Sequence, residues 1–328
     1  MRTFTMSLML GAAALMVSAM PVYAQEAAEV ICGGEGNRFR VPHNDVSVCE
    51  VDPVIAEAGQ ELQIVRNRPL LFGGIPRPGI VGYGTWVDWE ADPAGPAISE
   101  VRYEYNPDFR RAAGREYVQF PDGDPVIRVV KAGRAWNESQ LPGMNPVDVD
   151  DPALAALRQA RIWLTPHGII AAAAFTAKGL CPTANLSSED DPELCPDHSV
   201  EVVDNDTINV TLYGADYTVT LGDNRRPARV EATVNGTSLV ATYGTYRNGT
   251  GMGGQPSDEQ IALWIDAGDI DALAESNGPL DKFRVGVYYP EQMTLEVNGN
   301  TVLDIEITQG WTGKYQPFPD PELVIAAQ

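Results

Sequence analysis

The amino-acid sequence predicts an α+β fold in which a strongly curved antiparallel sheet, shaped as a half-barrel, wraps around two or three helices. Apolar and polar residues alternate in many short segments, as they do in strands with one buried face. Helix signals are few, and two of them stand together between groups of these segments. One predicted helix is apolar on every side, so it has to be covered on every side. A sheet that curves around this helix meets that requirement.

The strand prediction rests on period-two alternation, which places every second side chain on the same face. The clearest alternating segments are residues 207–212, 217–221, 230–234 and 303–307. Two Asn-Gly pairs, at 235–236 and 298–299, favour tight hairpin turns because both residues accept a positive φ. Sustained alternation with short turns predicts an antiparallel sheet that has one apolar and one solvated face.

The first of the two consecutive helices is predicted to begin at residue 152. Asp151 stands at the N-cap position and Pro152 at the first helical position, which is a common helix start. The predicted apolar side of this helix consists of Leu154, Leu157 and Ile162.

The second helix is predicted to repeat this start, with Thr165 as the N-cap and Pro166 after it, and to end before Gly179. Its segment GIIAAAAF is apolar all round, and its four consecutive alanines leave room that bulky side chains would have filled. A further surface helix is predicted to start at Ser257. The all-apolar helix is the one that the curved sheet is expected to cover.

The first 24 residues predict a secretory signal peptide. They contain an early cation at Arg2, an apolar run from Met6 to Met16, and small or apolar residues at Val22 and Ala24. Cleavage is therefore expected near Ala24, and no later stretch reaches the roughly 18 apolar residues of a membrane span. Only four of the 23 basic residues are lysine, which is typical of a GC-rich bacterial genome, so a periplasmic location is predicted.

The remaining chain is predicted to have two parts. Residues 73–84, GGIPRPGIVGYG, are rich in Gly and Pro and indicate a boundary. We therefore expect an N-terminal segment with a disulfide bond at residues 25–75 and the half-barrel domain at residues 76–328. The formal net charge of −22 argues against nucleic acid or an anionic membrane surface as a partner and favours simple solubility.

The four cysteines form two pairs that are local in the sequence. They are Cys32 with Cys49 and Cys181 with Cys195. In an oxidising compartment two short-loop disulfides are the natural prediction, although four cysteines allow three connectivities. A zinc site is the alternative, but neither pair has the C-x₂₋₄-C spacing of common zinc sites. No metal site is expected.

The segment TPHGIIAAAAF, together with YTVTLGDNRRPARVEATVNGTSLVATYGTYRNG, resembles the half-barrel of bacterial lipoprotein carriers of the LolA and LprG type. The resemblance covers about residues 80–315 and is closest at Pro227 and the ARVEATVNG after it. It implies an unclosed antiparallel sheet that wraps around helices and shelters acyl chains. The same stretch is similar to the region preceding the hydrolase domain of some secreted metallo-β-lactamase-fold proteins. The H-x-H-x-D-H cluster of that domain is missing, since His43, His167 and His198 stand alone.

His167 is the one candidate catalytic residue. It follows Pro166 in the first turn of the apolar helix, where the helix macrodipole disfavours a charged imidazolium. We expect a partly buried polar residue at the helix start, with a general base assisted by a carboxylate as the alternative. The sequence has no G-x-S-x-G, S-x-x-K or C-x-x-C-H motif, so no nucleophile and no haem or other cofactor is predicted.

The function that these observations favour is non-catalytic binding or carriage of a hydrophobic small molecule or lipid. In a half-barrel, apolar side chains that point inward would line the ligand cavity. The predicted ligand-binding residues are Ile169, Ile170, Ala172, Ala173, Phe175, Tyr243 and Trp264. Two alternatives stay open. One is a hydrolase or lyase on the same scaffold that uses His167 with a carboxylate, and the other is an accessory protein that interacts with another exported protein.

Overall fold

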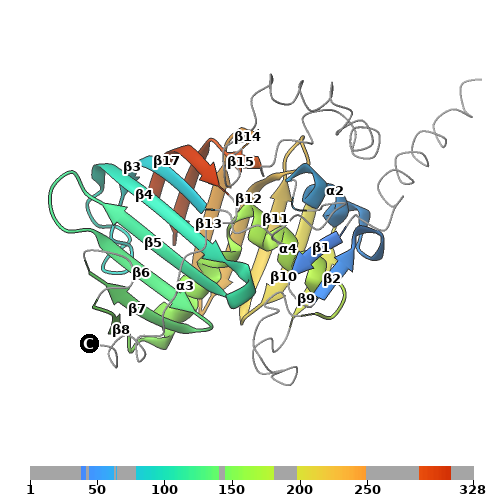
Figure 1. Ribbon diagram of the computed structural model, residues 1–328, viewed down its shortest axis with the longest axis horizontal. Coiled ribbons are helices and arrows are strands. Elements are labelled where there is room, and N and C mark those ends of the chain that lie inside the picture. Colours follow the sequence, from blue (N-terminus) through green and yellow to red (C-terminus); the bar gives the residue numbers. More distant parts are fainter. Residues whose placement is uncertain are drawn as a thin grey trace, which may run out of the picture.

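A large antiparallel sheet dominates the computed structural model of the protein (Figure 1). The structure describes residues 38–41, 44–62, 64, 79–139, 145–180, 198–248 and 288–311. The described α-helices are α2 (Pro53–Glu61), α3 (Pro152–Trp163) and α4 (Pro166–Thr176). The described strands are β1 (Arg38–Val41), β2 (Asn44–Ser47), β3 (Gly79–Trp86), β4 (Ile98–Asp108), β5 (Ala113–Gln119), β6 (Val126–Lys131), β7 (Arg134–Glu138), β8 (Val147–Asp148), β9 (Ser199–Val202), β10 (Thr207–Leu212), β11 (Ala215–Leu221), β12 (Pro227–Val234), β13 (Thr237–Tyr243), β14 (Tyr246–Asn248), β15 (Tyr288–Pro290), β16 (Gln292–Val297) and β17 (Asn300–Trp311). These elements confirm the predicted α+β class.

Thirteen of the described strands form one sheet. Their order is β8-β7-β6-β5-β4-β3-β17-β16-β13-β12-β11-β10-β9, and every neighbouring pair is antiparallel. The alternating segments of the sequence lie in β10, β11, β12 and β17, and their apolar side chains are buried. The predicted antiparallel sheet is therefore confirmed.

Both Asn-Gly pairs form the tight turns that the sequence predicts. Asn235 and Gly236 have φ values of 49° and 79° between β12 and β13, and Asn298 and Gly299 have φ values of 49° and 78° between β16 and β17. Positive φ at both central residues matches the twist of the flanking strands. These two turns fix the register of β12 against β13 and of β16 against β17.

The second half of the Gly- and Pro-rich stretch that predicts a boundary belongs to a central strand, and the predicted boundary itself lies outside the described residues. Residues 79–86 form β3, which pairs with β4 on one side and β17 on the other. A Cβ atom on Gly84 would lie 2.0 Å from the main-chain oxygen of Asp304. The glycine therefore permits the close approach of β3 and β17, as glycine does elsewhere in strands.

Helices α3 and α4 begin at the two predicted prolines, but only one has the predicted cap. The Asp151 carboxylate accepts hydrogen bonds from the main-chain N–H groups of Ala153 and Leu154 at 2.9 and 3.3 Å. The Thr165 hydroxyl does not cap α4; it donates to the main-chain oxygen of Ile162 at 2.7 Å. That carbonyl belongs to the last turn of α3, where carbonyls lack partners within the helix.

Helix α3 lies between two distant parts of the sheet (Figure 1). It contacts β5, β6 and β7, and it also contacts β12, which five strands separate from β5 in the sheet order. Tyr217 on β11 donates its hydroxyl hydrogen to the carbonyl of Ala160 at 3.4 Å, and Tyr243 on β13 donates to the carbonyl of Leu164. The sheet therefore bends around α3.

The segment before the sheet contributes to the same hydrophobic core. Val54, Ile55, Ala58 and Leu62, on and just after α2, belong to one cluster with α4 and the inner side chains of the sheet. The Asp52 carboxylate caps α2 by accepting from the main-chain N–H of Val54 at 2.9 Å. Residues 53–62 and the sheet thus share a core.

Several sequence-based predictions fall outside the described residues. They are the signal peptide, the helix starting at Ser257, Trp264, and the cysteines Cys32, Cys181 and Cys195. Cys49 is disulfide-bonded, and both predicted pairings stay predictions because no other cysteine is described. None of the helices in the described part of the chain is long and apolar enough to cross a membrane.

Candidate functional site

Helix α4 is buried along its whole length. All of its eleven residues are buried, and the side chains from Ile169 to Phe175 have no exposed surface. It is contacted by β9 and β10 of the sheet, by α2, by α3 and by β1. The expectation that the apolar helix is covered on every side is therefore confirmed.

One of the elements that cover α4 is the short helix α2, which we call the α2 cover (residues 53–62). Its two external ion pairs join it to the turn between β11 and β12. Arg225 Nε lies 3.1 Å from Glu57 Oε2, and Arg226 Nη2 lies 3.0 Å from Glu61 Oε2. Both glutamates are close to half exposed, and such pairs contribute about 0–1 kcal/mol each. Apolar contacts rather than these ion pairs hold the α2 cover on α4.

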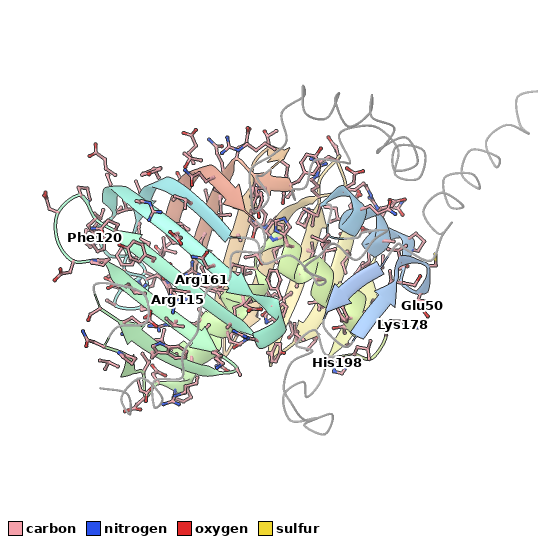
Figure 2. The ribbon with its side chains drawn as sticks, in the orientation of Figure 1. Glu50, Arg115, Phe120, Arg161, Lys178 and His198 are labelled. Carbon is pink, nitrogen blue, oxygen red and sulfur yellow. The ribbon has the colours of Figure 1, made fainter. Side chains whose placement is uncertain are left out.

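A third exposed ion pair lies just after the C-terminal end of α4. Lys178 Nζ lies 3.7 Å from Glu50 Oε1, so the residues just after α4 contact the segment just before α2 (Figure 2). Solvent-exposed ion pairs thus lie just before the α2 cover and along its second half.

His167 joins α4 to the α2 cover through the main chain of Tyr288. Its Nε2 lies 2.7 Å from the carbonyl oxygen of Tyr288, and because a carbonyl only accepts, Nε2 carries the proton. The main-chain N–H of Tyr288 donates to the carbonyl of Leu62 at 3.3 Å. The Arg226 guanidinium lies 3.8 Å above the Tyr288 ring centre. His167 is therefore part of the packing that holds α2, α4 and β15 together.

His167 is more deeply buried than the sequence suggests. Its side chain is 2 % exposed, whereas a partly buried residue is expected at a helix start. Burial lowers the pKa of His167 to about 4, although the hydrogen bond to Tyr288 opposes this shift. The imidazole is neutral at neutral pH. Within the described part of the chain its one hydrogen bond goes to a main-chain carbonyl, and no carboxylate partner for catalysis is seen.

The structure brings most of the predicted ligand-binding residues together. Ile169, Ile170, Ala172, Ala173 and Phe175 lie on α4. Tyr243 comes from β13 and binds the carbonyl of Leu164, at the junction between α3 and α4. Trp264 lies outside the described residues. The ligand-binding role of these residues stays a prediction.

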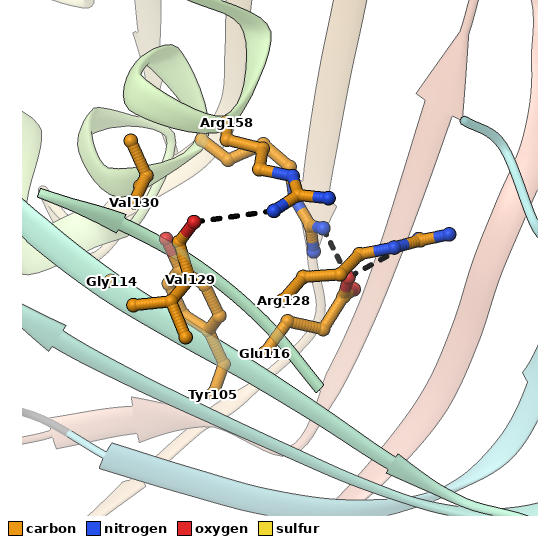
Figure 3. A pocket seen from close by; sticks show the side chains of 8 residues that line it. Tyr105, Gly114, Glu116, Arg128, Val129, Val130 and Arg158 are labelled. Atoms are coloured by element: carbon orange, nitrogen blue, oxygen red, sulfur yellow. Dashed lines mark hydrogen bonds and ion pairs between the residues drawn. The ribbon is translucent and has the colours of Figure 1, made fainter. Parts of the chain in front are cut away.

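A second buried site, which the sequence does not reveal, lies between α3 and strands β4 to β6 (Figure 3). We call its three arginines, Arg128, Arg158 and Arg161, the arginine cluster. Arg161 Nη1 donates to Glu116 Oε1 at 2.7 Å, and Arg128 Nη1 donates to Glu116 Oε2 at 3.4 Å. Arg158 donates to both carboxylate oxygens of Glu90 at 2.7 Å. The cluster thus joins the helix to the sheet by charged hydrogen bonds.

Aromatic rings enclose these charges. The Arg128 guanidinium lies 5.2 Å from the ring centre of Trp86, and the Arg161 guanidinium lies 5.5 Å from Trp89 and 5.4 Å from Tyr105. Burial alone would raise the pKa of the Glu116 carboxyl, but the guanidinium groups of Arg161 and Arg128 outweigh this effect and lower it. Glu116 is therefore ionised at neutral pH.

The buried side of α3 is more polar than the sequence suggests. Ile162 is fully buried and Leu154 and Leu157 pack against the core, but Arg158 and Arg161 are also buried, at 4 % and 6 % exposure. The spacing of three residues places both arginines on one side of the helix. The buried carboxylates come from elsewhere in the chain, so the pairing could not be seen from α3 alone.

The chain matches no protein-family model and no curated protein sequence. Among the described residues, no group of three or more His, Cys, Asp and Glu side chains is arranged to hold a metal ion. The two sites above are therefore interpreted from their own chemistry.

Proposed function

We propose that the protein is exported to the periplasm by its first 24 residues and binds or carries a hydrophobic or lipid-like ligand within a half-barrel. One observation supports this proposal above the others: α4, an apolar helix with four consecutive alanines, lies between the bent sheet and the α2 cover. Because the alanine side chains of α4 are small, they would leave room for an acyl chain once the α2 cover moves away. The resemblance to lipoprotein carriers of the LolA and LprG type points in the same direction.

Ligand access in this proposal requires movement of the α2 cover. The side chains from Ile169 to Phe175 have no exposed surface, so a ligand reaches them only by displacing part of their packing. Helix α2 has nine residues, and its external ion pairs are solvent-exposed. Its displacement is therefore expected to cost less free energy than opening the hydrogen-bonded sheet. The ligand would replace the apolar contacts that α2 makes with α4.

The proposal predicts a bound molecule in the purified protein. Native mass spectrometry of the protein isolated from the periplasm is expected to show a co-purified apolar molecule. Replacing Ala172 with Leu puts a bulky side chain where the ligand would bind after the α2 cover moves, so the Ala172→Leu protein is expected to lose this molecule while its circular dichroism spectrum is retained. Ala153→Leu is the matched control, because Ala153 is exposed on α3, and it is expected to keep the molecule.

The carrier proposal fails if the purified protein contains no bound molecule and takes up no hydrophobic fluorescent probe. In that case Ala172→Leu and Ala173→Leu are both expected to overpack a dry core and to lower the free energy of unfolding by about 1–3 kcal/mol.

A further inference from the structure

A small cavity lies beside the arginine cluster. It is lined by Tyr105, Gly114, Glu116, Val129, Val130 and the three arginines, all of which are buried. The space available to the centre of a water-sized species is about 10 Å³, which corresponds to one water molecule or one ion of similar size. Residue 114 has no Cβ; one placed there would lie 2.7 Å from the Tyr105 hydroxyl oxygen. The lack of a side chain at Gly114 therefore lets the Tyr105 hydroxyl pack against the main chain of β5 at the wall of the cavity.

The groups around the cavity offer more hydrogen-bond donors than acceptors. Tyr105 is 6 % exposed, and its hydroxyl has no hydrogen-bond partner within the described structure. Burial raises the pKa of Tyr105, so the hydroxyl keeps its proton and is able to donate. A guanidinium has five N–H groups and accepts nothing; in the described part of the chain Arg161 donates to Glu116 and to Tyr103. Both oxygens of Glu116 already accept from arginines.

The buried charges around the cavity do not balance. Three guanidinium groups, each at most 6 % exposed, face two buried carboxylates, Glu116 at 4 % and Glu90 at 9 %. The next carboxylate, Asp88, contacts Arg128 but is 46 % exposed. Water screens an exposed charge more than a buried one, so Asp88 compensates the third guanidinium only in part. A buried charge without compensation is costly.

We propose that this cavity binds a single small monatomic anion, chloride under ordinary conditions, which accepts the hydrogen bond of the Tyr105 hydroxyl beside the arginine cluster. The anion accepts from an unpartnered donor and adds a buried negative charge beside three buried guanidinium groups. This site is separate from α4 and does not depend on the carrier proposal.

Thermal unfolding in different sodium salts at constant ionic strength tests the site. The melting temperature is expected to fall by about 2 °C or more when chloride is replaced by gluconate, which is too large for the cavity, and to recover in bromide. Tyr105→Phe removes the donor and is expected to abolish the difference between chloride and gluconate. Tyr117→Phe is the control, because the Tyr117 hydroxyl donates to Gln119 Oε1 at 2.8 Å and does not line the cavity; it is expected to keep the difference.

Crystals grown in bromide provide a readout that does not depend on the stability of a variant. An anomalous peak within hydrogen-bond distance of the Tyr105 hydroxyl is expected. Equal melting temperatures in all three salts, an undiminished chloride effect in Tyr105→Phe, or a cavity that holds only water in the bromide crystals would each overturn the proposal.

Discussion

Replacing Glu116 with Gln is expected to lower the free energy of unfolding by about 3–5 kcal/mol, the cost of removing one partner of a buried ion pair. Gln has nearly the same volume, so the change removes charge without leaving a cavity. Arg161 and Arg128, which donate to the two carboxylate oxygens, would face an amide that has only one acceptor oxygen. Urea denaturation at neutral pH measures the loss.

A matched control is offered by an exposed pair in the same sheet. Arg229 Nε lies 2.8 Å from Glu231 Oε1, and both side chains are more than 40 % exposed. Glu231→Gln is expected to change the free energy of unfolding by less than about 1 kcal/mol. Equal effects of the two substitutions would show that the arginine cluster does not anchor α3 to the sheet.

The protein is expected to lose about 3 kcal/mol of stability through His167 alone as the pH falls from about 6.5 to about 4. Burial lowers the pKa of this imidazole in the folded protein to about 4, whereas the unfolded chain has the ordinary value near 6.5. Between these values the unfolded state binds more protons than the folded state, so stability is full above pH 6.5 and declines toward pH 4. Urea denaturation over this pH range measures the slope.

One variant separates His167 from the carboxylates that titrate at the lower end of this range. His167→Gln keeps a donor for the Tyr288 carbonyl but does not titrate, so its stability is expected to fall less steeply over the same range. A slope that is the same in His167→Gln and in the unchanged protein would show that His167 is not buried in the neutral form.

Local patterns in the sequence predicted the antiparallel sheet, four of its strands and two of the helices. The Asn-Gly turns, the alternation in β10 to β12 and the start of α3 at Asp151 and Pro152 are interactions between residues close in sequence, so the sequence carries their signal. Helix α2 has the same start, Asp52 followed by Pro53, but it was not predicted. With nine residues it is near the lower limit of ordinary helices, and its stability comes from packing on α4.

The features that the sequence did not predict depend on contacts between distant residues. Strand β3 contains glycines that look like a boundary, and only the approach of β17, more than 200 residues later, explains them. The partners of Arg158 and Arg161 are Glu90 and Glu116, which come well before α3 in the sequence. Charged residues are usually exposed, so nothing in the local pattern marked these four as buried.

The central claim, that α4 beneath the α2 cover is the binding surface for an apolar ligand, is tested most directly by photo-cross-linking. The protein is irradiated with a fatty acid that carries a diazirine near the end of its chain, and the labelled peptides are identified by mass spectrometry. The account predicts label on peptides that contain residues 166–176 or 53–62, competition by unlabelled fatty acid, and loss of this label in Ala172→Leu. Label spread over other peptides, or label on α4 that is unchanged in Ala172→Leu, would contradict it.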